Sequence, residues 1–218
     1  MSGDGGAAPA PMIAWSIGPG AAGPPPRLDD VAAAVRVGSL TGDPVAARRA
    51  LAREWAAATL RLDPEGISLA HDGTGAPRLA GAAAGAFVSL SSRGEVGAVA
   101  ISRLRIGVDV EAFGPVQPPA EAALSPAERA RLAALAPARA HRAFVALFAA
   151  KEAYLKALGV GFARDPVLVE PSIDGEAIAG IVDGGRPAPL VAGGVREVRI
   201  AGAECVVACV ALGPPLNR

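Results

Sequence analysis

Two acidic residues occupy one side of a predicted strand over residues 103–111. Four apolar residues alternate with polar ones there, namely Leu104, Ile106, Val108 and Val110. This alternation is typical of a half-buried strand, so Asp109 and Glu111 project from the same face. Two carboxylates at i and i+2 could share a hard cation such as Mg²⁺, and Gly107 on that face leaves room for a ligand to approach. An ordinary strand with a polar, solvent-facing side has the same pattern, and the segment taken alone favours that simpler interpretation.

A second set of charged residues lies on a predicted helix. At roughly 100° per residue, one apolar stripe contains Lys151, with Glu152 and Lys156 together at its edge. A surface Glu-Lys pair and a snorkelling Lys151 are the simpler interpretations. However, the chain has only two lysines, Lys151 and Lys156, among 21 basic residues. Because a solvated face would accept arginine equally well, this placement favours a role for the compact ammonium, such as binding a phosphate oxygen.

The elements that would position these residues follow from periodicity and turn signals. We expect helices over residues 45–62 and 138–158 and a shorter helix at the capping box Ser125-Pro126-Ala127-Glu128. The expected strands are 12–17, 66–70, 87–90, 96–102, 103–111, 167–169, 178–182, 195–200 and 205–212. Each half of the chain contains a helix and ends in a β-hairpin. The sequence therefore predicts two α+β lobes, 12–102 and 103–218, after a flexible leader at 1–11, with a ligand site between the lobes.

Composition narrows the function classes. The 21 basic and 21 acidic residues cancel, so no nucleic-acid or membrane-surface binder is indicated. Cys205 and Cys209 read as buried free thiols, and neither a signal peptide nor a membrane span is expected, which predicts a cytoplasmic protein. With His71 and His141 as the only histidines, a histidine-rich metal centre is excluded, and His71 reads as a surface turn residue. Serine-hydrolase elbow, Walker loop and Cys-x-x-Cys motifs are absent from the sequence.

Two segments resemble the signature motifs of the 4'-phosphopantetheinyl transferase superfamily. They are Ile106-Gly107-Val108-Asp109-Val110-Glu111 and the run from Phe148 to Gly159, which reads FAAKEAYLKALG. The intervening Leu124-Ser125-Pro126-Ala127-Glu128 and the trailing Gly159-Val160-Gly161 are similar to the larger, carrier-promiscuous type, which is typified by the surfactin-synthetase activator. In the first half, Arg49-Ala50-Leu51-Ala52-Arg53 and Val88 to Gly94 resemble further family segments.

Two positions depart from the family pattern. Ala76 stands where a turn lysine is usual, and Ser92 where a histidine that helps to bind a coenzyme A phosphate is usual. Both changes remove polar groups from the nucleotide end of the site, and nearby arginines could compensate.

The resemblance implies an α+β fold made of a pseudo-twofold pair of similar lobes, with coenzyme A in the cleft. It implies an Mg²⁺-dependent enzyme, a holo-[acyl-carrier-protein] synthase, that transfers 4'-phosphopantetheine to a carrier-protein serine and releases 3',5'-ADP. Asp109, Glu111 and Glu152 would bind the metal, Glu152 would act as general base, and Lys156 would stabilise the phosphate. The expected coenzyme A ligands are Arg49, Arg53, Arg78, Ser91, Ser92, Arg93, Asp109, Lys151 and Lys156.

The implied partner is an acyl- or peptidyl-carrier protein, met by the loop Phe113 to Leu124 and by Arg129 and Arg131 on the following helix. Because both lobes lie in one chain, a monomer is expected. Two alternatives stay open: a degenerate homologue that binds carrier protein or coenzyme A without transfer, for which Ala76 and Ser92 speak, and an unrelated metal-dependent phosphohydrolase.

Overall fold

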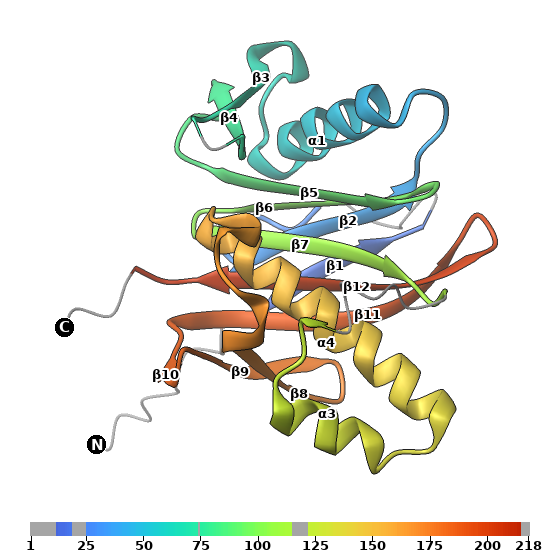
Figure 1. Ribbon diagram of the computed structural model, residues 1–218. Helices are drawn as coiled ribbons and strands as arrows, with labels where there is room; N and C mark the ends of the chain where they lie inside the picture. Colours follow the sequence, from blue (N-terminus) through green and yellow to red (C-terminus); the bar gives the residue numbers. More distant parts are fainter. Residues whose placement is uncertain (1–11, 19–24, 74, 115–121, 215–218) are drawn as a thin grey trace, which may run out of the picture.

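The structure, a computed structural model, describes residues 12–18, 25–73, 75–114 and 122–214. These residues form a mixed α+β fold in which two main sheets pack against each other, with α1 and α4 on their outer faces (Figure 1). The leader predicted at 1–11 and most of the predicted carrier-facing loop, residues 115–121, lie outside the described residues.

The first main sheet is built from the N-terminal half of the chain. Its strand order is β1(Ile13–Ile17), β2(Ala33–Ser39), β6(Val96–Ser102) and β5(Phe87–Arg93). Strands β1 and β2 are parallel, whereas β2, β6 and β5 are antiparallel to one another. A separate hairpin of β3(Ile67–His71) and β4(Pro77–Gly81) follows α1 and the short 3-10 turn η1(Pro64–Gly66).

The second main sheet is built from the C-terminal half. Its order is β10(Arg186–Pro187), β9(Ala177–Asp183), β11(Leu190–Ile200), β12(Ala203–Leu212) and β7(Arg105–Ala112), with β8(Val169–Asp174) paired to β9. The strands β2-β6-β5 and β7-β12-β11 have the same order, the same antiparallel directions and a helix after their first member. The two predicted hairpins, β5-β6 and β11-β12, are both present.

Helix ends are set by local sequence. Helix α1(Pro44–Leu60) begins after Asp43, whose side chain accepts a hydrogen bond from the Ala46 N–H. Helix α3(Pro126–Ala133) begins with the predicted capping box of Ser125 and Glu128. Helix α4(Pro137–Leu158) ends at Gly159, which has the positive φ of 74° that glycine adopts without strain. Two further 3-10 turns, η2(Gly161–Ala163) and η3(Pro166–Leu168), lead into β8.

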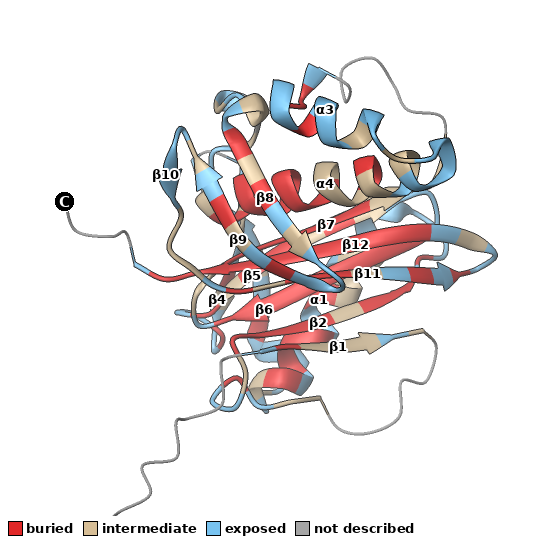
Figure 2. Cartoon of the chain, turned by 90° about the horizontal axis from the view of Figure 1, so that it is seen from below, coloured by how far each residue is buried: buried red, intermediate tan, exposed pale blue. Residues whose placement is uncertain are grey.

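Three apolar clusters hold these layers together. One lies between the two main sheets, one between α1 and the first sheet, and one between α4 and the second sheet. Strand β12 contributes alternate residues to two of them: Val207 and Cys209 face the first sheet, whereas Val206 and Ala208 face α4. Burial on both sides explains its continuous apolar sequence, and Figure 2 shows β12 buried along most of its length.

Most expected elements occur with shifted ends, but β4 and β2 were not predicted and the strand at 167–169 was wrong. No strand was assigned to Ala33–Ser39, yet β2 lies inside the first sheet. Val35 and Val37 alternate with Arg36, but this β-branched run is short and is flanked by alanine and glycine, which are depleted in strands. The strand expected at 167–169 is largely η3, because Asp165 accepts a hydrogen bond from the Val167 N–H and starts a turn there; β8 begins at Val169.

Two further expectations concerned the cysteines and membrane-spanning segments. Cys205 and Cys209 are free and buried, as predicted, and lie in the cluster between the sheets. Among the described residues, no helix combines the length and the hydropathy needed to cross a membrane.

Candidate functional site

Helix α4 approaches strand β7 unusually closely at Gly107. A β-carbon added to Gly107 would lie 1.8 Å from the Ala153 carbonyl oxygen and 2.6 Å from the Ala157 nitrogen. Ala149, Ala153 and Ala157 are buried and recur every fourth residue, so small side chains line this side of the helix. The expectation that Gly107 leaves space for a ligand was therefore wrong, because the helix backbone fills that space. The close contact places Glu152 and Lys156 beside the carboxylate face of β7.

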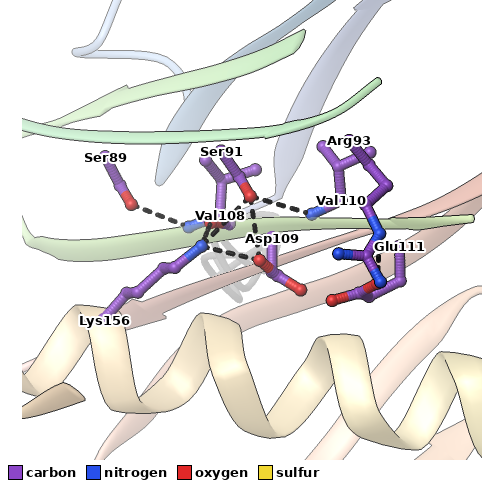
Figure 3. A network of polar contacts seen from close by, with 8 residues as sticks. All are labelled: Ser89, Ser91, Arg93, Val108, Asp109, Val110, Glu111 and Lys156. Carbon is purple, nitrogen blue, oxygen red and sulfur yellow. Dashed lines mark hydrogen bonds and ion pairs between the residues drawn. The ribbon is translucent and has the colours of Figure 1, made fainter. Parts of the chain in front are cut away.

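Serine hydroxyls join β7 to β5 of the first sheet. The Val108 N–H donates to Ser89 Oγ at 3.0 Å, and the Val110 N–H donates to Ser91 Oγ at 3.2 Å (Figure 3). These side chains accept bonds that a neighbouring strand's carbonyl groups would accept in a continuous sheet. The Ser91 hydroxyl also donates to Asp109 Oδ1 at 2.9 Å. Ser91 thus links the two sheets and orients Asp109, in addition to the coenzyme A contact predicted for it.

Lys156 extends from α4 into this junction. Its ammonium donates to Asp109 Oδ1 at 2.6 Å, to Ser91 Oγ at 3.1 Å and to the Val108 carbonyl at 3.2 Å (Figure 3). The Lys156 side chain is 30% exposed and borders a cavity, whereas the Asp109 side chain is 5% exposed. The structure therefore brings Lys156, Asp109 and Ser91 together, as their assignment to one site requires.

Three carboxylates gather around Lys156. Burial, and after it the negative charge of Asp109, raises the pKa of Glu152 to about 7, with a further increase from Glu111 and a decrease from Lys156. Burial and Asp109 likewise raise the pKa of Glu111, while Arg93 and Lys156 lower it. Arg93 Nε lies 3.3 Å from Glu111 Oε2. Asp109 thus raises the pKa of both Glu111 and Glu152, and Glu111 raises that of Glu152, so negative charge is concentrated at this place.

The donor set fits a hard cation, although the side chains do not form a finished metal site. Asp109 Oδ2 and Glu152 Oε1 are buried and lack a hydrogen-bond partner among the described residues. Buried carboxylate oxygens are normally paired or bound to a metal. Within the described part of the chain, however, no group of three potential ligands is close enough to hold an ion. Lys156 and Arg93 supply the compensating charge in this arrangement.

Lys151 points away from this site. Its side chain is 0% exposed and its ammonium donates to Glu128 Oε2 at 2.6 Å, Ala123 O at 2.8 Å and Pro166 O at 3.0 Å. Burial lowers the pKa of Lys151, while the bond to Glu128 raises it in part. Lys151 is enclosed by these partners and does not line the cavity, whereas the Lys156 side chain is 30% exposed and does line it. Its contacts contradict the predicted role of Lys151 in coenzyme A binding.

Three adjoining cavities extend from Lys156 toward α1. The largest, about 700 Å³, is lined by Ala76, Pro77, Ser89, Lys156 and residues 159–161. It shares Pro77 and Leu90 with a cavity of about 210 Å³. That cavity in turn shares Arg49 with one of about 600 Å³, which Arg53 also lines. Arg49 and Arg53 therefore line the member of this series of neighbouring cavities that shares no lining residue with the one at Lys156.

The other predicted nucleotide ligands are less central. Arg78 pairs with Asp72 at 2.8 Å and lies over the Phe87 ring, and Arg93 is bound to Glu111. Ser92 is partly exposed on β5 beside them. Sequence reasoning missed Arg48, which lines the cavity of about 210 Å³; His71 is exposed, as expected of a surface residue, and lines the same cavity. The Arg48-Arg49 pair at the start of α1 was the available signal, whereas His71 reaches the cavity only because β3 packs near α1.

Comparison with known families bears on the C-terminal half. Residues 105–189, from the start of β7 through α3, α4, β8 and β9, match the family model of the 4'-phosphopantetheinyl transferase superfamily. No curated protein matches the chain. The matched segment contains Asp109, Glu111, Glu152 and Lys156. Residues 105–189 are therefore similar to the 4'-phosphopantetheinyl transferase superfamily, and the match does not extend to the N-terminal half of the chain.

Proposed function

We propose that this transferase moves the 4'-phosphopantetheine arm of coenzyme A to a serine of an acyl- or peptidyl-carrier protein and releases 3',5'-ADP. The observation that carries the proposal is the convergence of three carboxylates and Lys156 where β7, β5 and α4 meet, beside the cavity of about 700 Å³. The two lobes would be 12–102 and 103–218, in a pseudo-twofold arrangement that their common strand order supports.

Asp109, Glu111 and Glu152 would hold Mg²⁺, the hard cation that carboxylate and phosphate oxygens favour. When bound, the metal supplies positive charge that neutralises the substrate's pyrophosphate. The unpartnered, buried oxygens of Asp109 and Glu152 support this assignment, because a cation would satisfy both. Release of Asp109 from Lys156 would accompany metal binding, leaving the ammonium free to face the cavity.

Glu152 would act as general base. Without bound metal its pKa is about 7, and a cation would lower this value, so that Glu152 would be ionised and able to accept a proton at physiological pH. The carrier serine oxygen attacks the phosphorus attached to pantetheine, its proton passes to Glu152, and the bond to the second phosphate of the pyrophosphate breaks. The departing 3',5'-ADP carries the added negative charge, which Lys156 stabilises.

Coenzyme A would extend from Lys156 along the adjoining cavities, with its nucleotide toward Arg49 and Arg53. Arg93 and Ser92, which follow Ser91 in β5, are proposed contacts, and Arg93 would need to release Glu111. Arg78 is proposed with the added requirement that it leave Asp72. Arg48 and His71 supply further polar groups at the wall of the cavity of about 210 Å³.

The deciding experiment is transfer itself. The protein is incubated with coenzyme A, Mg²⁺ and several apo carrier proteins, and each carrier is weighed by mass spectrometry. One added phosphopantetheine and stoichiometric 3',5'-ADP are expected from wild type, and neither from Glu152→Ala. Unmodified carriers throughout would contradict the proposal, as would full activity in Glu152→Ala.

A binding protein without transfer activity is the second candidate, and Ala76 at the wall of the largest cavity favours it. It predicts that calorimetry detects coenzyme A or carrier binding while the mass of the carrier stays unchanged. Release of phosphate or nucleotide without any carrier would instead indicate a phosphohydrolase.

Carrier recognition is assigned to the segment Phe113 to Leu124 and to Arg129 and Arg131 of α3. Both arginines are exposed and have no acidic partner within 4 Å in the described part of the chain. An acidic carrier surface would complement them. Reversing both charges should weaken carrier binding at least tenfold, whereas unchanged affinity would remove α3 from the interface.

A further inference from the structure

Helix α3 is a short element with little polar attachment to the rest of the fold. It has eight residues, of which only Glu128 is buried. Among the described residues, the ion pair between Glu128 and Lys151 is the single side-chain polar contact that joins α3 to α4. The orientation of α3 therefore depends on this pair and on the apolar contacts of Leu124 and Leu132.

The same carboxylate also starts the helix. Glu128 Oε2 accepts the Ser125 N–H at 2.8 Å and the Lys151 ammonium at 2.6 Å, while the Glu128 N–H donates to Ser125 Oγ at 3.2 Å. The capping box and the anchor to α4 thus share one oxygen atom. A shift of Lys151 would move the first turn of α3 as a unit.

Lys151 connects three segments at one point. Besides Glu128, its ammonium binds Ala123 O, just before α3, and Pro166 O in η3. Both partners' side chains in the ion pair are 0% exposed. Burying an ion pair adds little net stability compared with apolar residues of similar size, so geometric definition is the stronger reason for a pair of this kind.

The position of Lys151 in α4 gives this geometry a functional meaning. It immediately precedes Glu152 and lies five residues before Lys156, so the helical turn that presents these two side chains to β7 also holds α3. The two lysines project to different sides: Lys156 to Asp109, and Lys151 to Glu128. Helix α3 and the carboxylate site are consequently fixed to one rigid element.

We propose that Lys151 and Glu128 are positioning residues for the protein partner: they hold α3, with Arg129 and Arg131, at a fixed place relative to Glu152, so that a carrier bound to α3 presents its serine to the site. This inference rests on the proposed function for the identity of the partner. It assigns Lys151 a role in recognising the protein substrate through α3, in place of the predicted role in binding coenzyme A.

The test replaces the pair by apolar residues in the full-length protein. In Glu128→Leu/Lys151→Met no buried charge is left alone, and the folded state is checked by thermal unfolding. We expect carrier KM, and carrier Kd from calorimetry, to rise at least tenfold, while coenzyme A KM and 3',5'-ADP affinity change less than twofold. Glu128→Gln, which keeps the shape of the pair, should give an intermediate rise in carrier KM and serves if the double variant does not fold.

Tyr154→Phe is the matched control. Tyr154 is another buried polar residue of α4, and its hydroxyl donates to Asp183 Oδ2 of β9 at 2.9 Å, away from α3. It should lower stability without changing carrier KM. Unchanged carrier Kd in a folded Glu128→Leu/Lys151→Met protein, or an equal rise in Tyr154→Phe, would overturn the inference. Absence of transfer by wild type, with carrier binding retained and dependent on the pair, would contradict the proposed function alone.

Discussion

The two lysines show how a single residue type can serve two different tasks. Each ammonium lies among three protein oxygens, one of them a carboxylate: Lys156 with Asp109, Ser91 and Val108, and Lys151 with Glu128, Ala123 and Pro166. Three acceptors converging on one nitrogen suit an ammonium and not a planar guanidinium. This geometry explains why a chain with 19 arginines has lysine at these two positions.

The raised pKa of Glu152 predicts a pH-dependent stability. The folded-state pKa of about 7 exceeds the ordinary 4.5, so folding favours the protonated acid and this group's stabilising effect is lost as pH rises from 4.5 to 7. In the absence of metal, Glu152→Gln should therefore be more stable than wild type at pH 8, by on the order of 3 kcal/mol, and equal to it near pH 4. Urea unfolding in a chelator at both pH values measures the difference. The same difference at pH 4 and pH 8 would contradict this origin.

Ser91 is expected to matter for both stability and activity. Ser91→Ala removes the acceptor of the Val110 N–H and a partner of Asp109 and Lys156. Leaving these buried groups unsatisfied should lower the free energy of unfolding by about 2 kcal/mol. We also expect kcat to fall while the KM for carrier is kept. Ser92 is the next residue and has no side-chain hydrogen bond in the described structure, so Ser92→Ala should leave the free energy of unfolding unchanged in chemical denaturation. An equal loss of stability in both variants would refute the role of Ser91.

At the scale of elements, the contact of α4 with β7 decides where the site lies. The small residues Gly107, Ala153 and Ala157 allow helix and strand backbones to meet, and the charged residues beside them then face one another. The sequence pattern placed Asp109 and Glu111 on one face of a strand. Which face this was, solvent or helix, depended on packing between segments more than 40 residues apart.

Gly107→Ala tests this contact directly. The new methyl group would overlap the Ala153 carbonyl oxygen at 1.8 Å, so α4 must shift and the free energy of unfolding should fall by about 3 kcal/mol. Transfer activity should fall with it, because Glu152 and Lys156 move away from Asp109. Gly180→Ala in β9, where no atom lies within 4 Å of the added carbon, is the control and should be neutral or stabilising. Thermal unfolding measures both variants, and an equal change in stability for Gly107→Ala and Gly180→Ala would contradict the prediction.

At the scale of the whole molecule, the site forms where the two sheets meet. Strand β5 supplies Ser89 and Ser91, β7 supplies Asp109 and Glu111, and α4 supplies Glu152 and Lys156. No one of these elements contains the complete set. A ligand that bridges them should stabilise the folded protein as a unit, because it binds the native state only.

Magnesium is the simplest such ligand to test. If Asp109, Glu111 and Glu152 bind Mg²⁺, the metal should relieve the repulsion between them and raise Tm. At a Mg²⁺ concentration of 100 times Kd, the free energy of unfolding should increase by about 2.7 kcal/mol. Asp109→Asn should abolish the Mg²⁺-induced increase, and sodium at matched ionic strength should not reproduce it. Differential scanning calorimetry with and without a chelator measures the effect. An equal Mg²⁺ response in wild type and in Asp109→Asn would place the metal elsewhere.

The sequence by itself determined the local features. Alternation placed Asp109 and Glu111 on one face, the Ser125-Glu128 capping box started α3, and the two motifs indicated the family that residues 105–189 match. These features depend on residues close in the chain, where period and turn chemistry act directly. The two lysines could be singled out from sequence, because their rarity among arginines is visible without coordinates.

Only the tertiary structure decided what those residues contact. It directed Lys151 to Glu128 and away from the cavity, filled the space beside Gly107 with α4, placed β2 inside a sheet and brought His71 to a cavity wall. Each outcome depends on partners distant in sequence, and local periodicity carries no information about which distant segment will pack on a given face. The charged pattern could therefore be predicted from sequence, whereas the separation of its two lysines into a site residue and an anchor for α3 depended on three-dimensional packing.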